Sequence, residues 1–174
     1  CSSDLVIIAV FAVSTLWCGI RSRELAQQRD WLDQAAVRGL EGLLSAQGWA
    51  GEYWSALAAN PQDSAAPLDL LMEKTHGPHS TAWWVNGVQL KLGLLGKVIG
   101  FSVLAMQIGQ IQNFDPSQSQ ELLRNLTSGL GVALLTTMVG LVGNILLGLQ
   151  LTRMDRFADQ LLAQAQRHGL IIGR

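Results

Sequence analysis

The sequence is poor in charged residues. Only 14% of its 174 residues are Asp, Glu, Lys or Arg, whereas about one quarter of a typical soluble domain is charged. Hydrophobic residues make up 49% of the chain, and the formal net charge is −1. The basic residues form no single patch, so nucleic-acid binding is not expected. Few charges among so many apolar residues predict a protein that faces lipid.

Cysteine and histidine are also scarce, which argues against disulfide and metal chemistry. Cys1 and Cys18 stand at opposite ends of the first apolar run, about 25 Å apart in a helix, too far to pair. His76 and His79 are separated by a Gly-Pro dipeptide, which predicts a turn with both rings in solvent. We predict no metal and no cofactor. No nucleophile and base pair or phosphate loop is visible, so an enzyme is not expected.

Three apolar runs occupy residues 5–20, 92–111 and 130–151. The second and third meet the ~20-residue requirement for crossing a bilayer core. The first is shorter and could be the apolar region of a signal peptide. However, no small-residue cleavage site follows it, and Arg21 and Arg23 come directly after. We therefore expect a first span that is truncated at its start, an interpretation favoured over a lipidated Cys1.

Lys and Arg are distributed unevenly between these runs. Six lie between the first and second runs and four in the C-terminal tail, but only Arg124 lies between the second and third. The positive-inside rule then predicts a periplasmic N-terminus and a cytoplasmic C-terminus. The predicted division is a first transmembrane helix (1–20), a cytoplasmic helical region (21–79), a second transmembrane helix with a cytoplasmic extension (80–112), a short periplasmic loop (113–116), a third transmembrane helix with a cytoplasmic extension (117–168) and a tail (169–174).

The long connection has helical patterning. Apolar residues at helical spacing predict an amphipathic helix over 25–44 that ends at Gly48, followed by short helices over 49–57 and 68–74. These faces are expected to pack on neighbouring helices; lying on the lipid surface is a weaker alternative, because basic residues do not line the polar face. Ser80 is a good N-cap for a helix of about 47 Å that ends near Ile111. Pro116 is suited to the first position of the last helix, which can continue past Leu162.

Glycine recurs in the second and third runs. Small residues let helix backbones approach closely in lipid. The pattern predicts tight helix packing, within the chain or between copies, at Gly93, Gly96, Gly100, Gly140 and Gly143.

Polar residues also interrupt these two runs. Thr137 and Asn144 lie seven residues apart, on one face of a helix, with Gly140 between them and Thr136 adjacent. Lys97 would cost ~2.5 to 3.5 kcal/mol near the centre of a span, so it should face a partner or water, or snorkel to the interface. Neither run contains Asp or Glu. If the protein conducts protons, we expect another subunit to supply the titrating carboxylate.

Two of these segments carry a resemblance. The stretch LGLLGKVIG at 92–100 resembles the LGLLGTVxG motif of the MotA/TolQ/ExbB proton-channel family, and ALLTTMVGLV at 133–142 resembles its ALxTTxxGLxxA motif. The two motifs fall on the expected spans in the expected order. The similarity covers about residues 90–157, and the preceding region matches only in architecture.

The resemblance implies a fold and a function. It implies an all-α membrane protein of the TolQ/ExbB-like branch with three transmembrane helices and long helical cytoplasmic extensions. Five copies, in the bacterial inner membrane, would surround two copies of a single-span TolR/ExbD-like subunit that carries an essential Asp. Such a complex couples ion flow to work across the cell envelope, as in biopolymer and protein transport. The predicted ion pathway comprises Thr136, Thr137, Asn144 and Lys97, with Thr137 matching the family's pore-facing threonine.

Lys97 departs from the family pattern, which has threonine at this position, and Leu146 replaces a frequent proline. A lysine that faces the pore could pair with the partner's Asp, alter ion choice, or abolish conduction. The alternative prediction is therefore a non-conducting membrane scaffold in which Lys97 blocks or alters the ion path.

Overall fold

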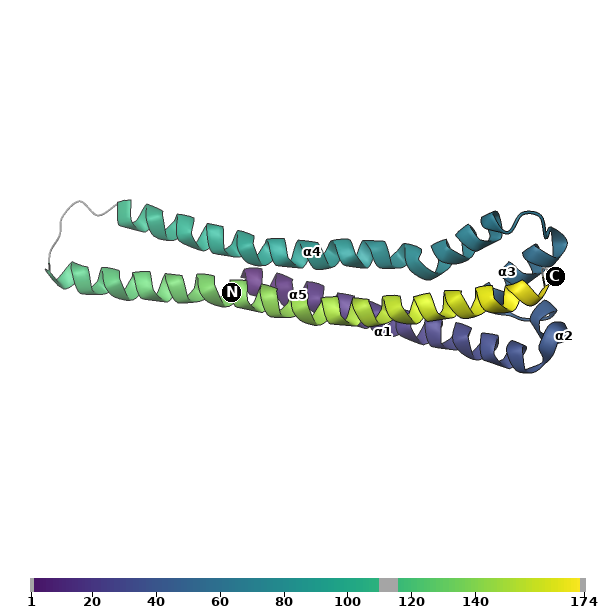
Figure 1. The fold of residues 1–174 in the computed structure, drawn as a ribbon. Coiled ribbons are helices and arrows are strands. Elements are labelled where there is room, and N and C mark those ends of the chain that lie inside the picture. The colour runs from purple at the N-terminus through teal and green to yellow at the C-terminus, as the bar shows by residue number, and fades with distance from the viewer. Residues whose placement is uncertain (1, 110–115, 173–174) are drawn as a thin grey trace. The chain divides into compact units, whose positions relative to one another are not determined.

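The computed structural model is built of helices. It describes residues 2–109 and 116–172, and every regular element among them is a helix, as the sequence predicts. Three helices, α1, α4 and α5, are long and apolar enough to cross a membrane. The five helices are α1 (Ser2–Val37), α2 (Gly39–Leu44), α3 (Gly48–Ala59), α4 (Ala65–Gly109) and α5 (Pro116–Ile172) (Figure 1).

The chain divides into two compact units, and α1, α4 and α5 each contribute to both. Unit 1 comprises Cys1–Ser14 and Trp84–Gly148, and unit 2 comprises Thr15–Trp83 and Leu149–Arg174. The second apolar run and most of the third lie in unit 1, whereas the first is shared between the units.

The start of α4 corrects the sequence prediction. A helix over 68–74, a turn at Gly77-Pro78 and a new helix from Ser80 were expected, but α4 is one helix from Ala65 to Gly109 with Pro78 inside it. The predicted turn is therefore wrong.

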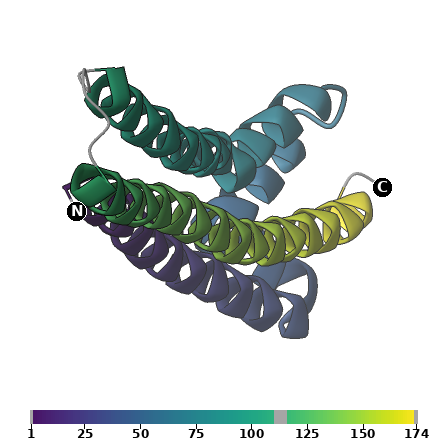
Figure 2. The same ribbon diagram turned by 90° about the vertical axis from the view of Figure 1, so that its left-hand side faces the viewer.

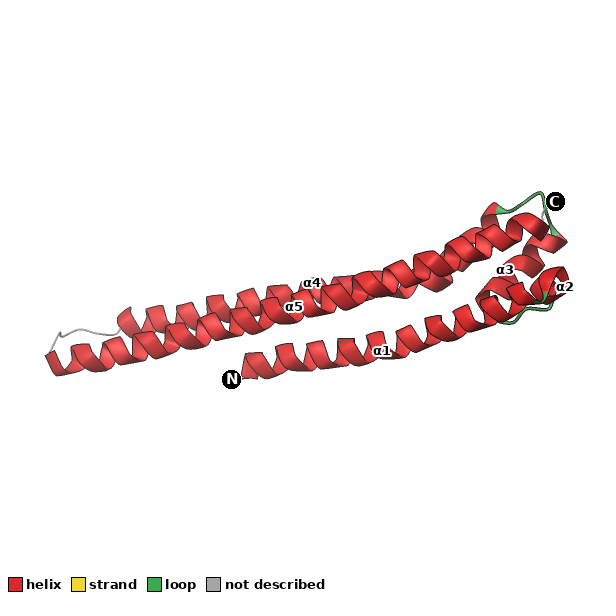
Figure 3. Cartoon of the chain, turned by 60° about the horizontal axis from the view of Figure 1, so that its bottom comes forward, coloured by secondary structure: helices red, strands yellow, loops and turns green. Residues whose placement is uncertain are grey.

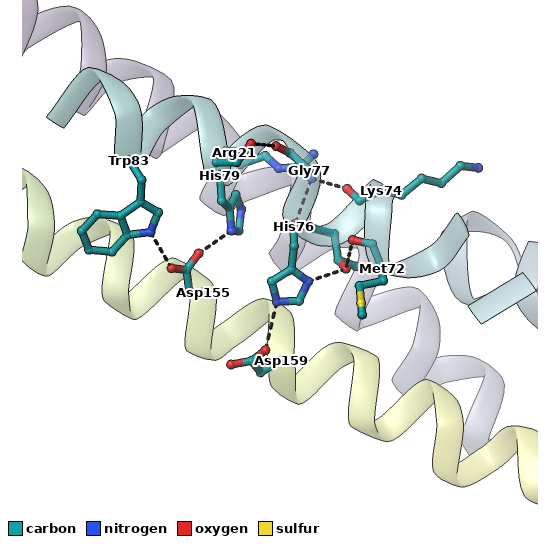
Figure 4. A network of polar contacts seen from close by, with 11 residues as sticks. Arg21, Met72, Lys74, His76, Gly77, His79, Trp83, Asp155 and Asp159 are labelled. Carbon is teal, nitrogen blue, oxygen red and sulfur yellow. Dashed lines mark hydrogen bonds and ion pairs between the residues drawn. The ribbon is translucent and has the colours of Figure 1, made fainter. Parts of the chain in front are cut away.

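A side chain from α1 explains why α4 continues through the proline. Proline has no N–H, so the carbonyl four residues earlier, that of Lys74, loses its helical donor. The guanidinium of Arg21 donates to this carbonyl, and to the carbonyl of Thr75 at 3.3 Å (Figure 4). Arg21 is itself 7% exposed. A buried cation thus replaces the hydrogen bond that would otherwise be lost.

The other boundaries agree with the predictions in part. The first helix ends at Val37 instead of continuing to residue 44, because Gly39 has a φ of +69° and turns the chain into α2. The short helix predicted over 49–57 is α3, which ends at Ala59 with Asn60 as its C-cap. The last helix begins at Pro116 and runs unbroken to Ile172. Apart from Pro116, the predicted loop at 113–116 lies outside the described residues.

Close backbone contact joins α4 and α5 in unit 1. A Cβ added at Gly140 would lie 2.9 Å from the Cα of Gly93, and one added at Gly100 would lie 3.1 Å from the Cβ of Ala133. Any side chain larger than hydrogen would force the backbones apart at the first contact. Gly96, between Gly93 and Gly100 on α4, is half-buried. In unit 1, α5 has α4 on one side and α1 on the other (Figure 2).

Large apolar side chains cover the outside of unit 1. Leu5 is 68% exposed, Val98 is 60% exposed and Ile145 is 59% exposed. Soluble monomers rarely expose so much contiguous apolar surface. This exterior fits lipid or the apolar surface of other membrane helices.

Unit 2 has a helical core made from all five helices. Trp54 of α3 is fully buried and donates its indole N–H to the carbonyl of Ala165 on α5 at 2.9 Å. Gln28 of α1 accepts the N–H of Trp49 at 2.9 Å, which satisfies a free donor in the first turn of α3. The faces predicted to pack on neighbouring helices do so, and the core consists of Leu32, Ala35, Leu43, Ala50, Tyr53, Trp54, Leu57, Leu71, Leu161 and Ala165.

The glycine contact can be tested by substitution. Gly140→Val should lower the thermal unfolding midpoint in detergent, because overpacking a tight interface costs about 1–3 kcal/mol. Gly131→Val is the matched control, since nothing lies within 4 Å of a Cβ at that position. Equal midpoints for the two variants would contradict the proposed contact.

Candidate functional site

The polar face of α5 is turned toward α4 inside unit 1. Thr137 donates its hydroxyl to the carbonyl of Ala133 at 3.0 Å and lies 3.5 Å from that of Gly93 on α4. Further along the same face, the side-chain amide of Asn144 donates to the backbone carbonyl of Asn86 at 2.8 Å and to the side-chain oxygen of Asn86 at 2.9 Å. The structure therefore brings both predicted residues to an interface within one chain. Asn86, which precedes the apolar run, was not predicted.

Gln89 of α4 is fully buried beside this face. Its amide packs against Gly143, where a side chain on α5 would collide with it. Neither amide atom has a hydrogen-bond partner among the described residues. The side chain also borders an apolar cavity of about 240 Å³ that Ile7 and Phe11 of α1 help to line. A buried amide without partners is expensive in an apolar layer, so this position is suited to hold water or another polar group.

Thr136 faces α1 instead of α4. Its hydroxyl lies 2.5 Å from Oδ1 of Asp4 and 3.1 Å from the carbonyl of Val132. Thr136 is 2% exposed, and Asp4 is half-buried. Asp4 was not predicted, because it directly precedes the first apolar run, where a charged residue is an ordinary flank. Its only signal in the sequence was a carboxylate adjoining an apolar run.

Lys97 of α4 is half-exposed. Its ammonium lies 5.9 Å from the centre of the Phe101 ring, one turn further along the same helix. A cation over an aromatic face is stabilised by about 0.5–1 kcal/mol at exposed sites. Among the described residues, Lys97 takes no part in the hydrogen bonds of Thr137 and Asn144.

A second polar cluster lies in unit 2, between α4 and α5. His79 donates Nδ1–H to Oδ1 of Asp155 at 2.6 Å, and the indole of Trp83 donates to Oδ2 at 2.8 Å. One turn away, Nε2 of His76 lies 2.9 Å from Oδ1 of Asp159 (Figure 4). His79 is 2% exposed, so the prediction of solvated histidines is wrong for this residue. The continuous helix through Pro78 turns its ring inward.

Burial lowers the pKa of His79 below its ordinary value of 6.5. Desolvation disfavours the charged ring and outweighs the opposing effects of the hydrogen bond and the negative charge of Asp155. The nearby positive charge of Arg21 and the His76 ring lower it further. At neutral pH, His79 is therefore an uncharged donor to Asp155.

Taken together, these groups form hydrogen bonds between the long helices. Among the described residues, no three His, Cys, Asp or Glu side chains are grouped so that they could hold a metal ion. The described side chains of unit 1 offer hydroxyls, amides and the carboxylate of Asp4. Such groups can hold water, transfer a proton or interact with an ion that passes.

Comparison with known proteins assigns the chain to no family. No protein-family model matches the chain, and no curated protein matches it.

The His79 cluster predicts a pH-dependent stability. Because the pKa of His79 is lower in the folded than in the unfolded chain, the unfolded chain takes up the proton first as the pH falls. The thermal midpoint should therefore fall as the pH drops below 6.5 and stay level just above it. His79→Gln should flatten this response, whereas His168→Gln should retain it. An unchanged pH response in His79→Gln would rule out His79 as its source.

Proposed function

We propose that this chain is the pore-forming stator or motor subunit of a bacterial inner-membrane complex. The complex couples the flow of ions, namely protons, to mechanical work across the cell envelope. The observation that carries the proposal is the polar face of α5 at Thr137 and Asn144, which lies in an apolar helix pair. Thr137 belongs to the motif at 133–142 and approaches Gly93 of the motif at 92–100. In the proposed topology the N-terminus is periplasmic and the C-terminus cytoplasmic.

Physical cost supports a functional role for these side chains. Polar groups inside a membrane are expensive and are retained where they serve a pathway or a partner. Thr137 and Asn144 satisfy their hydrogen bonds within the chain, yet both stay only half-buried. Their remaining surface could contact water or a partner helix. Gln89 adds a fully buried amide that makes no hydrogen bond to the described residues.

The partners in this proposal are further copies of the chain and a single-span subunit of the TolR/ExbD type. Five copies would enclose that subunit, whose Asp would titrate near Thr137. Proton flow down the membrane potential would supply about 2.3 kcal/mol per charge per 100 mV. The exposed apolar exterior of unit 1 leaves room for such helix contacts.

A threonine substitution tests the proposal. Thr137→Val removes the hydroxyl but keeps the shape, and it should lower coupled ion flux about tenfold or more, because a hydrogen bond to a charged group is worth about 1.5–3 kcal/mol. Thr127→Val is the matched control, since the Thr127 hydroxyl is exposed and bonds to Leu123 of its own helix. The complex should remain in the membrane in both variants. Normal ion flux in Thr137→Val would contradict the proposed function.

Lys97 favours a second candidate, a non-conducting scaffold that recruits partners through its cytoplasmic helices. A fixed positive charge beside an ion path repels cations, and Lys97 stands where the related motif has threonine. Lys97→Thr separates the two functions when proton flux is measured in vesicles that hold the complex. The pore proposal expects flux in the unmodified protein. Flux that appears only in Lys97→Thr would favour the scaffold.

A further inference from the structure

We propose that a cavity between α1 and α5 in unit 2 binds an anionic phospholipid of the cytoplasmic leaflet. The cavity has a volume of about 420 Å³, within the range of about 300–1,000 Å³ that is typical of small-molecule sites. All of its lining residues belong to unit 2. The inference uses the proposed topology only to name the leaflet, and it does not depend on ion flow.

The cavity lies where two apolar runs end. Its α1 wall consists of residues between Thr15 and Leu25, and its α5 wall of residues between Gln150 and Phe157. The first apolar run ends at residue 20 and the third at residue 151. The two helices run in the same direction (Figure 3), so both runs end beside the same cavity. In a bilayer, the end of an apolar run marks the border between acyl chains and headgroups.

A tryptophan of α4 supports this border. The indole of Trp83 donates to Asp155 at 2.8 Å, two residues after Arg153 of the cavity wall. Trp83 is 41% exposed. Tryptophan side chains are enriched at the membrane–water interface, where one end of the ring is in apolar surroundings and the other meets polar groups. The cavity is therefore level with phospholipid headgroups and the upper part of their acyl chains.

The charges at this level are suited to a phosphate. Arg153 lines the cavity, and Arg23 follows Ser22 of its wall. Both arginines are exposed, and neither has a hydrogen-bond or ion-pair partner among the described residues. The nearby carboxylate of Glu24 is paired with a different arginine, and that of Asp155 accepts two hydrogen bonds from α4. The uncompensated charge is therefore positive, and arginine matches the geometry of a phosphate group.

The interior of the cavity is suited to an acyl chain. Cys18, Leu25 and Met154 form buried, apolar parts of its wall. Two polar atoms of wall residues, the hydroxyl oxygen of Thr15 and the side-chain oxygen of Gln150, are buried without a partner among the described residues. Such atoms are expensive in an apolar wall. The ester oxygens of a phospholipid, just below its phosphate, are acceptors that a hydroxyl such as that of Thr15 lacks here.

Native mass spectrometry of the full chain tests the site. The chain is reconstituted in vesicles of equal parts phosphatidylglycerol and phosphatidylcholine, chosen to differ in mass, and then released into detergent. Phosphatidylglycerol should remain bound about fivefold more often than phosphatidylcholine, the effect of one basic residue near an anionic headgroup. Equal retention of the two lipids, or retention of neither, would overturn the proposal.

A variant that fills the cavity tests its place. Gly19 lines the cavity, and a Cβ added there would meet nothing within 4 Å, so Gly19→Leu can occupy the space without displacing a neighbour. This variant should lose the retained lipid. Gly131→Leu is the matched control, because its position is equally open but lies in unit 1. Equal lipid retention in the two variants would contradict the site.

An arginine variant tests headgroup recognition without changing the packing of the wall. Arg153→Gln should remove the preference for phosphatidylglycerol, whereas Arg167→Gln, an exposed position further along α5, should keep it. An unchanged preference in Arg153→Gln would contradict the assignment of the phosphate to this residue.

The number of chains in the complex distinguishes a lipid from a second copy of the chain. If Gly19→Leu changes that number while the unmodified protein retains no lipid, the cavity is an interface between copies and the proposal fails. None of these measurements depends on ion flux, so failure of the lipid site and failure of the proposed function are separate results.

Discussion

The close approach of α4 and α5 at Gly93 and Gly140 is the constraint on which the rest of unit 1 depends. Without side chains at these positions, the two backbones come within contact distance. That separation lets the Thr137 hydroxyl approach a carbonyl of α4 and lets Asn144 reach Asn86. The same contact fixes the register of the two helices, and with it the level at which every polar group of unit 1 lies.

Polar groups in each unit are satisfied chiefly by neighbouring helices. In unit 2, Arg21 replaces the hydrogen bond that Pro78 removes, and Asp155 accepts from both His79 and Trp83. In unit 1, carbonyls and amides of α4 and a carboxylate of α1 complete the bonds of α5. Gln89 departs from this pattern, because both of its amide atoms are buried without partners among the described residues. Single buried atoms also lack a partner in Thr15, Arg21, His79, Gln150 and Gln164. A protein that only crossed a membrane would have little reason to keep an amide at Gln89.

Sequence reasoning succeeded where one segment decides the outcome. Length and hydropathy sufficed for the three apolar helices, and the position of Pro116 sufficed for the start of α5. It failed where a distant residue decides. The Gly77-Pro78 pair predicts a turn, but the helix continues because Arg21 supplies the missing hydrogen-bond donor. Asp4 looks like an ordinary flanking charge in the sequence, but the packing of α1 on α5 brings it into contact with Thr136. Such tertiary contacts are not encoded in local spacing, so Asp4, Asn86 and buried His79 could only be found in three dimensions.

The account's central claim is that the polar contacts of Thr136 and Thr137 lie at a depth within the apolar layer of the membrane. Nitroxide labels at the exposed positions Leu5 and Leu135, with Cys1 and Cys18 replaced by alanine, report this depth through relaxation by oxygen and by a water-soluble nickel complex. The account predicts that both labels are equally accessible to oxygen and equally shielded from nickel. A label at Leu5 that nickel relaxes as strongly as one at the exposed Leu170 of unit 2 would contradict it.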